Sequence, residues 1–566
     1  MTLDNPATEA DLLVIGAGAA GMTAALVAAH EGLRVVLCEA TQQVGGTSAT
    51  SAGTLWIPGN PHGVAAGHAD TVDAARIYLD ALIGEPDHDG RREAFLCSGP
   101  AMLRYLEART AVKFASAGMH PDYLPHLPGA AVSGRAVSPL PFDGRLLGAD
   151  FGRVRPPLPE FMLLGGMMVG KADIAALVGR YRSWRAFAHS ARLVLRHAGD
   201  RLRHPRGARW VMGNALVGRL LHSLRSAHVD LRFGWRLRTL EGEDGRVVGA
   251  RLETQGRSLL LRTRLGVVLA TGGVGHDAAL RHSMAPHGPT MLALAAEAVR
   301  GDGLGTGRAV GAAMTSLARP FLWQPVSLVH RKDGSTGLFP HLFLDRAKPG
   351  LIAVDGQGRR FVDEAASYHH FVEGMARAGA VPAHLVCSTA FIRRHGLGAI
   401  PPGTRDLRPW LERRMLVVAP TLQALAQASG LPARALADTV QHHDHHARRG
   451  EDPDFHKGAS VFDRFNGDPA HAPNPCVGPI GPGPYAAMKV WPGDAASSAG
   501  LATDVDGRVL DAQGSAIEGL YACGNDAGSV FQGHYPGPGA TLGPGMAQAY
   551  RIALHARARA PSDIRG

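Results

Sequence analysis

Residues 11–39 form the segment that most constrains the fold of this chain. An apolar run, 12–15, meets a glycine-rich turn, 16–21, which leads into an alanine-rich helical pattern, and a second apolar run, 34–38, ends on Glu39. This order predicts a strand, a tight turn, a helix and a parallel strand, with an acid about twenty residues after the turn. The segment therefore predicts a dinucleotide-binding site.

The residue types in this segment match the roles that such a site requires. Gly16 permits the turn, Gly18 lets backbone amides approach a pyrophosphate, and Gly21 lets the helix pack closely on the strand. The positive N-terminus of the helix faces the phosphates. Glu39 accepts hydrogen bonds from an adenosine ribose, and an acid there disfavours a 2'-phosphate. The expected contacts of this segment are Gly16, Gly18, Ala19, Ala20, Gly21, Glu39 and Ala40.

Three later glycine-rich segments predict further contacts with the same ligand. One follows the acid at 45–48, and two apolar strands, 266–273 and 519–526, end in glycine. Glycine at a strand end allows the backbone to approach a ligand closely, so the three segments suit one long dinucleotide held from several sides. The expected contacts are Gly45, Gly46, Thr47, Ser48, Ala270, Thr271, Gly272, Gly524, Asn525 and Asp526.

The G-x-G-x-x-G turn occurs only once in the chain. A flavoprotein that is reduced by NAD(P)H usually has a second such turn for the nicotinamide nucleotide. One turn with distant additional contacts therefore favours tightly held FAD over NAD as the cofactor. Hydride would then come from the organic substrate, and the protein would orient the flavin and the substrate.

The length and the spacing of the segments predict an α/β protein of two domains. The 566 residues exceed one ordinary domain. We expect a Rossmann-like FAD-binding domain that is discontinuous in sequence, 1–289 and 496–566, with a basic helical insertion at about 175–210. An α+β substrate or catalytic domain, 290–495, is inserted in it.

Cysteine and histidine spacing gives no indication of a metal centre. The five cysteines lie far apart without a C-x-x-C pair, so we expect no disulfide, zinc ribbon, iron–sulfur cluster or attached haem. His442 and His446 stand one helical turn apart in a histidine-rich run, but no second group of ligands follows at usable spacing. We interpret this run as a solvated helix end.

The sequence also predicts where the protein is located. Asp4 and Glu9 precede the first strand, and no basic segment followed by a long apolar one is visible, so we expect no signal peptide. No run approaches the about 18 uninterrupted apolar residues that span a bilayer. We expect a cytoplasmic protein.

Residues 180–209 carry nine arginines against one acid, Asp200. Apolar residues, including Trp184, Phe187 and Leu195, are interleaved with them. The pattern predicts a basic amphipathic insertion, which suits either a solvated helical face, the simpler interpretation, or contact with an anionic membrane surface. No recognised nucleic-acid motif accompanies the charge, so we expect no nucleic-acid partner.

Taken together, the motifs of the chain resemble those of a known family. The chain resembles the fumarate reductase flavoprotein superfamily and, within it, the 3-ketosteroid dehydrogenases of the 1,2-desaturating type. The resemblance covers nearly the whole chain, and the basic insertion is its weakest part. Besides the opening segment, the motifs that carry it are 45–47, 54–58, 270–273, 360–364 and 535–544. The last of these, Tyr-Pro-Gly-x-Gly followed by Thr-x-Gly-Pro, is the most specific.

The resemblance implies a function and a set of site residues. It implies removal of a proton from C2 and a hydride from C1 of a 3-ketosteroid, or of a similar flat apolar ketone, with FAD as the hydride acceptor and an external electron acceptor, a quinone or another. Tyr535 and the backbone N–H of Gly539 would polarise the 3-keto oxygen, and Tyr368 would act as the base. Thr541 and Leu542 would contact the cofactor.

A tyrosine with a pKa near 10 is a poor base unless its anion is stabilised, and the resemblance implies a second tyrosine as helper. Tyr123 is our candidate, although Met119 and His120 depart from the aromatic residues expected before it, and His120 is an alternative helper. We expect Trp56 and Phe361 to be walls of the substrate pocket.

Three other functions stay open from the sequence. A reductase of the fumarate or urocanate type would place an arginine in the terminal glycine loop, and residues 533–537 contain none. A dehydrogenase acting at C4–C5 of a steroid would use a similar tyrosine near the flavin. A flavin-containing binding protein at the membrane would use the basic insertion and show little turnover.

Overall fold

The opening segment folds as the sequence predicts. The structure, a computed structural model, describes residues 9–181, 183–286, 291–342 and 345–561. Strand β1 (Glu9–Ile15) is followed by helix α1 (Ala19–His30) and strand β2 (Val35–Glu39), and β1 and β2 pair in parallel with Leu12 opposite Val35. The strand–turn–helix–strand prediction is confirmed.

These two strands lie in an eight-stranded sheet built from distant parts of the chain. The order is β10-β2-β1-β13-β12-β22-β21, with β11 paired to β12, and β22 also pairs in parallel with the second half of β13. The additional strands are β10 (Asp230–Phe233), β11 (Arg236–Glu243), β12 (Arg246–Thr254), β13 (Arg257–Leu269), β21 (Arg508–Leu510) and β22 (Ala516–Ala522). Residues after 507 therefore complete a sheet that begins at residue 9.

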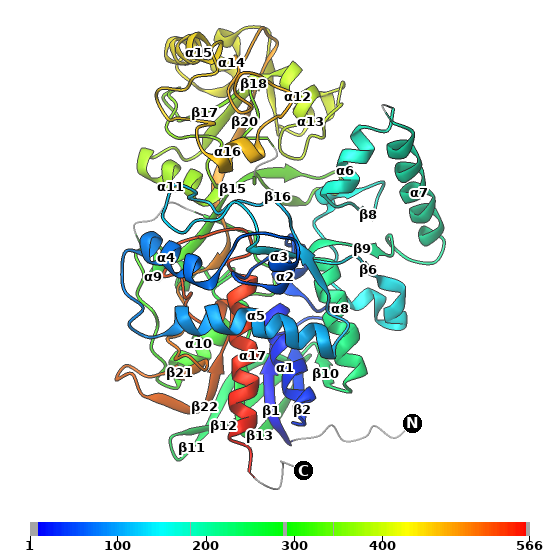
Figure 1. Cartoon of the computed structure of the whole chain (residues 1–566), viewed down its shortest axis with the longest axis vertical. Helices are drawn as coiled ribbons and strands as arrows, with labels where there is room; N and C mark the ends of the chain where they lie inside the picture. Colours follow the sequence, from blue (N-terminus) through cyan, green and yellow to red (C-terminus); the bar gives the residue numbers. More distant parts are fainter. Residues whose placement is uncertain (1–8, 182, 287–290, 343–344, 562–566) are drawn as a thin grey trace.

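Both faces of this sheet are covered, because the buried side chains of β1 alternate between two cores. Leu12 and Val14 belong to a core shared with α1, α8 (Met212–Ser226) and α17 (Leu542–Ala558). Leu13 and Ile15 belong to a second core shared with β12 and with α10 (Asp302–Ala309). Figure 1 shows α1 and α17 running along one face of the sheet.

A second, mainly antiparallel sheet forms the other half of the molecule (Figure 1). The order is β16-β15-β20-β18-β17, and β14 and β19 also pair with β20. The strands are β14 (Leu292–Ala293), β15 (Phe321–His330), β16 (Thr336–Pro340), β17 (Leu351–Val354), β18 (Ala383–Ser388), β19 (Val417–Ala419) and β20 (Tyr485–Ser497). The first sheet, with helices on its faces, and the mainly antiparallel second sheet together form the α/β fold with an inserted α+β part that the sequence predicts. β20 runs continuously across the expected boundary at 495–496.

Helices and short strands link the two sheets and cover the second one. They include α2 (Gly46–Thr50), α4 (Val72–Ile83), α5 (Arg91–Arg109), α11 (Tyr368–Ala378), α12 (Thr389–His395), α14 (Leu422–Ser429), α15 (Ala433–Ala447) and α16 (Val461–Asn466). The histidine-rich run ends α15. His442 and His445 are exposed as expected, but His443 is buried with its Nε2 3.3 Å from the Gly478 carbonyl oxygen, so the run is only partly a solvated helix end.

The basic insertion forms α6 (Lys171–Val178) and α7 (Trp184–Arg201), which Figure 1 shows at the edge of the molecule. They follow a hairpin of β7 (Met162–Leu163) and β8 (Met167–Met168). A small buried cluster of Met167, Val169 and Leu193 joins the hairpin to α7. Within the described ranges, no helix combines the length and the apolar character that a membrane span requires.

Candidate active site

The glycine turn after β1 forms a cradle that only glycine can build. Gly16 has φ +104°, and a Cβ there would lie 2.2 Å from the carbonyl oxygen of Ala270 at the end of β13. A Cβ at Gly21 would lie 1.9 Å from the carbonyl oxygen of Gly16. Gly18 caps α1 without a side chain, which leaves the positive helix N-terminus open to the cavity. This cradle fits a pyrophosphate group.

Glu39 lies where the acid of the motif is expected and lines the same cavity. Its carboxylate accepts hydrogen bonds from the backbone N–H of Ala17 at 3.0 Å and of Thr41 at 2.9 Å. Burial raises the pKa of Glu39, and these hydrogen bonds oppose the rise. The carboxylate thus fixes the glycine turn and can also accept hydrogen bonds from a ribose.

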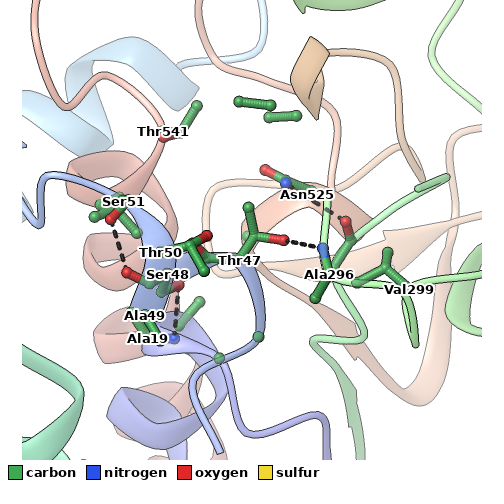
Figure 2. A pocket seen from close by; sticks show the side chains of 18 of the residues that line it. Ala19, Thr47, Ser48, Ala49, Thr50, Ser51, Ala296, Val299, Asn525 and Thr541 are labelled. Atoms are coloured by element: carbon green, nitrogen blue, oxygen red, sulfur yellow. Dashed lines mark hydrogen bonds between the residues drawn. The ribbon is translucent and has the colours of Figure 1, made fainter. Parts of the chain in front are cut away.

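The loop after β2 joins the two halves of the molecule at the cavity (Figure 2). On α2, the Thr47 hydroxyl accepts a hydrogen bond of 3.0 Å from the N–H of Ala296, and the Ser48 hydroxyl accepts one of 3.2 Å from the N–H of Ala19. Thr47 therefore connects this loop to the segment before β15. Ser48 connects it to the start of α1.

Most of the residues predicted to hold the cofactor line one continuous cavity. They are Gly16, Gly18, Ala19, Ala20, Gly21, Glu39, Ala40, Gly46, Thr47, Ser48, Ala270, Thr271, Gly272, Gly524, Asn525, Thr541 and Leu542. Gly45 and Asp526 are exceptions and lie behind the wall. A Cβ at Gly45 would lie 2.9 Å from Val217 of α8, so this glycine serves packing.

Asp526 supports the cavity without lining it. It is fully buried, and it accepts hydrogen bonds from the Thr271 hydroxyl at 3.0 Å and the Gly273 N–H at 2.8 Å. Burial raises its pKa to about 6. Asp526 thus ties the end of β22 to the end of β13, and the two glycine-rich strand ends meet at the cavity through it.

Several residues of the cavity wall were not predicted from the sequence. They are Arg155, Phe161, Met168, Trp235, Leu237, Leu294, Ala296, Ala298, Val299, Asp302, Gln324, Pro340 and Leu342. These residues belong to no motif and come together only through the approach of the two sheets. Trp56 and Phe361, expected in this wall, do not line the cavity. Trp56 is fully buried behind it, and Phe361 lines a different, outer cavity.

Three tyrosines meet in the cavity, although they come from segments far apart in sequence. The hydroxyl of Tyr123 donates a hydrogen bond of 2.7 Å to the hydroxyl of Tyr368. The ring centroids of Tyr123, Tyr368 and Tyr535 are 5.4 Å apart in all three pairs, and all three side chains are buried. The structure therefore brings together the three tyrosines that the resemblance singles out.

Each tyrosine is held by its own local structure. Tyr368 is the first residue of α11, whose N-cap is Ser367. The N–H of Tyr123 donates to the carbonyl oxygen of Pro536 at 3.0 Å, and the hydroxyl of Tyr78 donates to the same oxygen at 2.8 Å. Tyr123 and the loop of Tyr535 are thus fixed against each other.

Asp122, the residue before Tyr123, helps to hold Tyr123 in place. The carboxylate of Asp122 accepts hydrogen bonds from Trp56 Nε1 at 2.8 Å and from Arg135 Nη1 at 2.6 Å, and all three side chains are buried. Trp56 therefore acts through Asp122 as a support for the tyrosines and not as a wall of the pocket.

Gly539 also lines the cavity. Its φ is +91°, and a Cβ there would lie 2.3 Å from the carbonyl oxygen of Thr54. Its own carbonyl oxygen accepts from the N–H groups of Trp56 and Gly543. Across the part of the chain that the structure describes, none of the hydrogen bonds uses the N–H of Gly539. That N–H is available to a ligand.

The phenols are neutral in the resting site. Burial raises the pKa of Tyr123 and Tyr368 well above that of an ordinary tyrosine, and the proximity of the other phenols raises it further. Burial also raises the pKa of Tyr535. His369, whose ring centroid lies 5.9 Å from that of Tyr535, has its pKa lowered well below the usual range by burial. The site thus offers hydroxyl donors and a backbone donor in an uncharged, apolar setting, which suits a neutral carbonyl compound.

A family model and several known dehydrogenases match this chain. A family model described as FAD binding domain matches residues 11–542. A 3-oxosteroid 1-dehydrogenase of Mycolicibacterium smegmatis is 37% identical, over 99% of both chains. A 4-oxocyclohex-2-ene-1-carboxylate 5-dehydrogenase of Sinomonas cyclohexanicum is 35% identical, over 97% of this chain and 93% of that one.

Among solved structures, the 3-ketosteroid delta1-dehydrogenase from Sterolibacterium denitrificans in complex with 1,4-androstadiene-3,17-dione is similar, with a TM-score of 0.90. The two chains are 33% identical, and the match covers 98% of this chain and 100% of that one. FAD is therefore the cofactor that the glycine cradle fits.

Proposed function

The chain belongs to the FAD-binding flavoprotein family that includes the 3-oxosteroid 1-dehydrogenases, and from this membership we propose that it introduces a C1–C2 double bond into a 3-ketosteroid. The observation that carries the proposal is the tyrosine cluster. Tyr123, Tyr368 and Tyr535 lie close together and line the same cavity as the glycine cradle. Removal of two hydrogens beside a ketone needs such a set of groups.

Two donors polarise the ketone in this proposal. The hydroxyl of Tyr535 and the N–H of Gly539 bind the 3-keto oxygen and stabilise the negative charge that develops on it when C2 loses its proton. The free N–H of Gly539 and the close approach of its backbone to Thr54 support this role. Bound FAD supplies the acceptor for the C1 hydride.

Tyr368 takes the C2 proton as the base, with Tyr123 as its helper. The hydrogen bond between their hydroxyls stabilises a tyrosinate at Tyr368. Tyr368 also begins α11, and side chains of a helix tilt toward its N-terminus, where the helix dipole favours an anion. His120 lines the cavity too, but the direct bond of Tyr123 to Tyr368 favours the tyrosine as helper.

The composition of the cavity wall favours a neutral ketone over a dicarboxylate. Among the described residues of the wall, Arg155 is the one arginine, and its backbone N–H donates to the Val44 carbonyl oxygen in the loop before α2. A clamp for two carboxylates would need more cations. Leu294, Pro340, Leu342 and Met168 supply an apolar surface that fits a flat hydrocarbon ring system.

The position of the double bond that the protein introduces into a saturated steroid tests the proposal. 5α-Androstane-3,17-dione with an artificial electron acceptor should give 5α-androst-1-ene-3,17-dione. Formation of 4-androstene-3,17-dione instead would show C4–C5 dehydrogenation and contradict the assigned position. Conversion of 4-oxocyclohexanecarboxylate alone, assayed in parallel, would contradict the steroid as substrate.

We further propose that α7 and the β7–β8 hairpin bind the surface of an anionic membrane. Trp184, Leu195 and Leu202 are 77%, 73% and 86% exposed, and Leu164 at the hairpin turn is 65% exposed. On α7, Trp184, Phe187, Val194 and Leu195 follow helical spacing, while Leu193 on the opposite face is buried. The helix thus turns an apolar stripe toward solvent, which an ordinary solvated helix would not do.

The charge around the stripe suits anionic lipid. Arg185, Arg192, Arg201 and Arg203 are exposed, and none of them forms an ion pair with any described residue. Cations that flank an apolar stripe strengthen binding to anionic headgroups. The hairpin also connects this surface to the cavity, because Met168 lines the cavity and Met167 packs with Leu193 of α7. An apolar steroid dissolved in a bilayer would thus reach the site along a short path.

Vesicle co-sedimentation tests this surface. The protein should sediment with phosphatidylglycerol vesicles at low salt, less with phosphatidylcholine vesicles, and less at high salt. The triple variant Trp184→Ser/Leu195→Ser/Leu202→Ser should lose binding, and the control Arg434→Gln, a fully exposed arginine on α15, should retain it. No sedimentation of the wild-type protein with phosphatidylglycerol vesicles at low salt would contradict the proposal.

A further inference from the structure

We propose that the substrate proton leaves the active site through Tyr123 into a second, outer cavity, where Asp363 and Asp463 receive it. The inference rests on the proposed function and extends it, because a base that takes a proton at every turnover must also release it. The released proton needs a route that avoids the side of Tyr368 covered by cofactor and substrate.

The two cavities meet at one residue. Among the described residues, Tyr123 is the single member common to the walls of the cofactor cavity and the outer cavity. Tyr368 lines only the cofactor cavity, and its neighbour Ser367 lines only the outer one. The hydrogen bond of 2.7 Å between Tyr123 and Tyr368 therefore lies at the partition between the buried site and the outside.

The outer cavity opens to solvent. Its wall includes His126, Arg359 and His456, which are exposed. Deeper in the wall lie Asp463, which is buried, and Asp363, which is half-buried. Phe462, next to Asp463 on α16, packs its ring 5.2 Å from that of Tyr123. Asp463 thus follows a residue that packs on the helper tyrosine, and both acids share the outer cavity with Tyr123.

The backbone fixes both carboxyl groups. Asp363 accepts a hydrogen bond of 2.7 Å from the N–H of Ala365. Asp463 accepts one of 3.1 Å from the N–H of Ser460, and its own N–H donates to the Ser460 hydroxyl at 3.0 Å. Each carboxyl therefore has a fixed position in the cavity wall.

The electrostatic setting allows the pair to hold a proton near neutral pH. Burial raises the pKa of Asp363, and the charges of Asp463 and Glu364 raise it further; burial also raises the pKa of Asp463. Lys457 lowers the pKa of both. Two carboxyl groups close together share one proton more readily than they ionise together. The remaining titratable or charged residues of the wall are His126, Asp355, Arg359, Arg360, His370, Arg377 and His456.

Two cations around the acid pair, Arg360 and Lys457, bond to other groups. Arg360 forms ion pairs with Glu364 at 2.8 Å and Asp452 at 2.7 Å. The Lys457 ammonium donates to the Leu351 carbonyl oxygen at 2.8 Å and lies 3.4 Å from Glu364. His370 hydrogen-bonds the Ser367 hydroxyl at 2.6 Å, and burial lowers its pKa to about 4, so its imidazole is neutral.

The C2–H bond breaks and its proton joins the Tyr368 oxygen, while bound FAD would accept the C1 hydride together with its electron pair. The Tyr368 proton then moves to the Tyr123 oxygen, and the proton of Tyr123 moves outward to a carboxylate of the acid pair, which releases one proton to solvent per turnover. The same route produces the tyrosinate that removes the next C2 proton. Between turnovers the neutral phenol of Tyr368 predominates, because its pKa is raised.

Proton release measured with flavin reduction tests the route. Anaerobic mixing with 4-androstene-3,17-dione in weak buffer with a pH indicator reports both events at once. Asp363→Asn and Asp463→Asn, which keep the side-chain oxygen as an acceptor, should each slow proton release and steady-state turnover by about tenfold, less than the about 10²- to 10⁴-fold of a direct acid–base group. The steroid dissociation constant should not change.

Added imidazole or acetate buffer distinguishes a proton route from a structural role. These small bases enter the open outer cavity, so increasing their concentration should restore turnover of both variants and leave the wild-type rate unchanged. Asp454→Asn, an exposed acid outside both cavities, is the matched control and should behave as wild type. Because Asp363 is only half-buried, its variant remains informative if Asp463→Asn folds poorly.

Two results would overturn the proposal. One is wild-type proton release in both variants. The other is a loss of turnover that added buffer does not restore. Failure of the wild-type flavin to be reduced by the steroid would instead contradict the proposed function, so the two failures are distinguishable.

Discussion

The hydroxyl of Tyr123 lies 2.7 Å from the hydroxyl of Tyr368, although 245 residues separate them in sequence. Tyr123 comes from an irregular segment before β5 (Ala136–Pro139), and Tyr368 begins a helix that packs on the second sheet. Their contact therefore depends on the docking of the two halves of the chain. In the proposed mechanism the two phenols have different roles: Tyr368 is the base, and Tyr123 is its helper.

Replacement of each member separates those tasks. Tyr368→Phe should lower the rate of flavin reduction by about 10²- to 10⁴-fold, because it removes the proton acceptor. Tyr123→Phe should lower it by about tenfold, since the base remains but loses its hydrogen-bond donor. Anaerobic stopped-flow measurement gives both rates. Equal losses in the two variants would contradict the division into base and helper.

Loss of the Tyr535 hydroxyl should act on the transition state. Tyr535→Phe should lower kcat by about 10²-fold or more if this hydroxyl stabilises the developing oxyanion. Tyr550→Phe, on α17 and outside the cavity, is the matched control and should keep the wild-type rate. Steady-state kinetics with an artificial acceptor provide the comparison, and unchanged kcat in Tyr535→Phe would remove this residue from the mechanism.

The pH dependence of kcat/KM follows from the raised pKa of Tyr368. A base is active when deprotonated, and burial moves this deprotonation above the ordinary tyrosine pKa of about 10. The fraction of active base therefore increases as pH rises, so kcat/KM should increase from pH ~7 to pH ~9 without a plateau. Flavin fluorescence in parallel confirms that the cofactor stays bound. A plateau at neutral pH would indicate another base.

The glycine cradle should determine how much flavin the purified protein retains. In Gly16→Ala the new Cβ would lie 2.2 Å from the Ala270 carbonyl oxygen at a φ of +104°, so the turn must shift and flavin should be lost. Gly305→Ala, in α10 with no atom within 4 Å of its Cβ, should retain flavin. The ratio of flavin to protein absorbance after purification measures this. A fully loaded Gly16→Ala variant would show that the turn is not essential.

The parts of the site that the sequence predicts are those in which local geometry limits the residue type. Gly16 and Gly21 could be assigned because a turn between a strand and a helix requires glycine at that spacing. Gly45 shares a positive φ with Gly16 but serves packing against Val217. The sequence does not distinguish a backbone that approaches a ligand from one that approaches a helix.

Other features depend on how distant segments of the chain pack together, and no local sequence pattern predicts them. Leu294 and Gln324 line the cavity only because the second sheet packs over the first, and Trp56 supports Tyr123 through a hydrogen bond to Asp122, the preceding residue. Which face of α7 is exposed is a further feature that the sequence does not predict. An amphipathic pattern predicts a helix, and only the fold shows that Trp184 and Leu195 stay exposed instead of packing against the core.

Anaerobic mixing of the oxidised holoprotein with 4-androstene-3,17-dione tests the central claim most directly. The absorbance of the oxidised flavin should decay in a single turnover, with formation of one equivalent of 1,4-androstadiene-3,17-dione, and it should persist in Tyr368→Phe. Persistence of the oxidised flavin absorbance in the wild-type protein at saturating steroid would contradict the account.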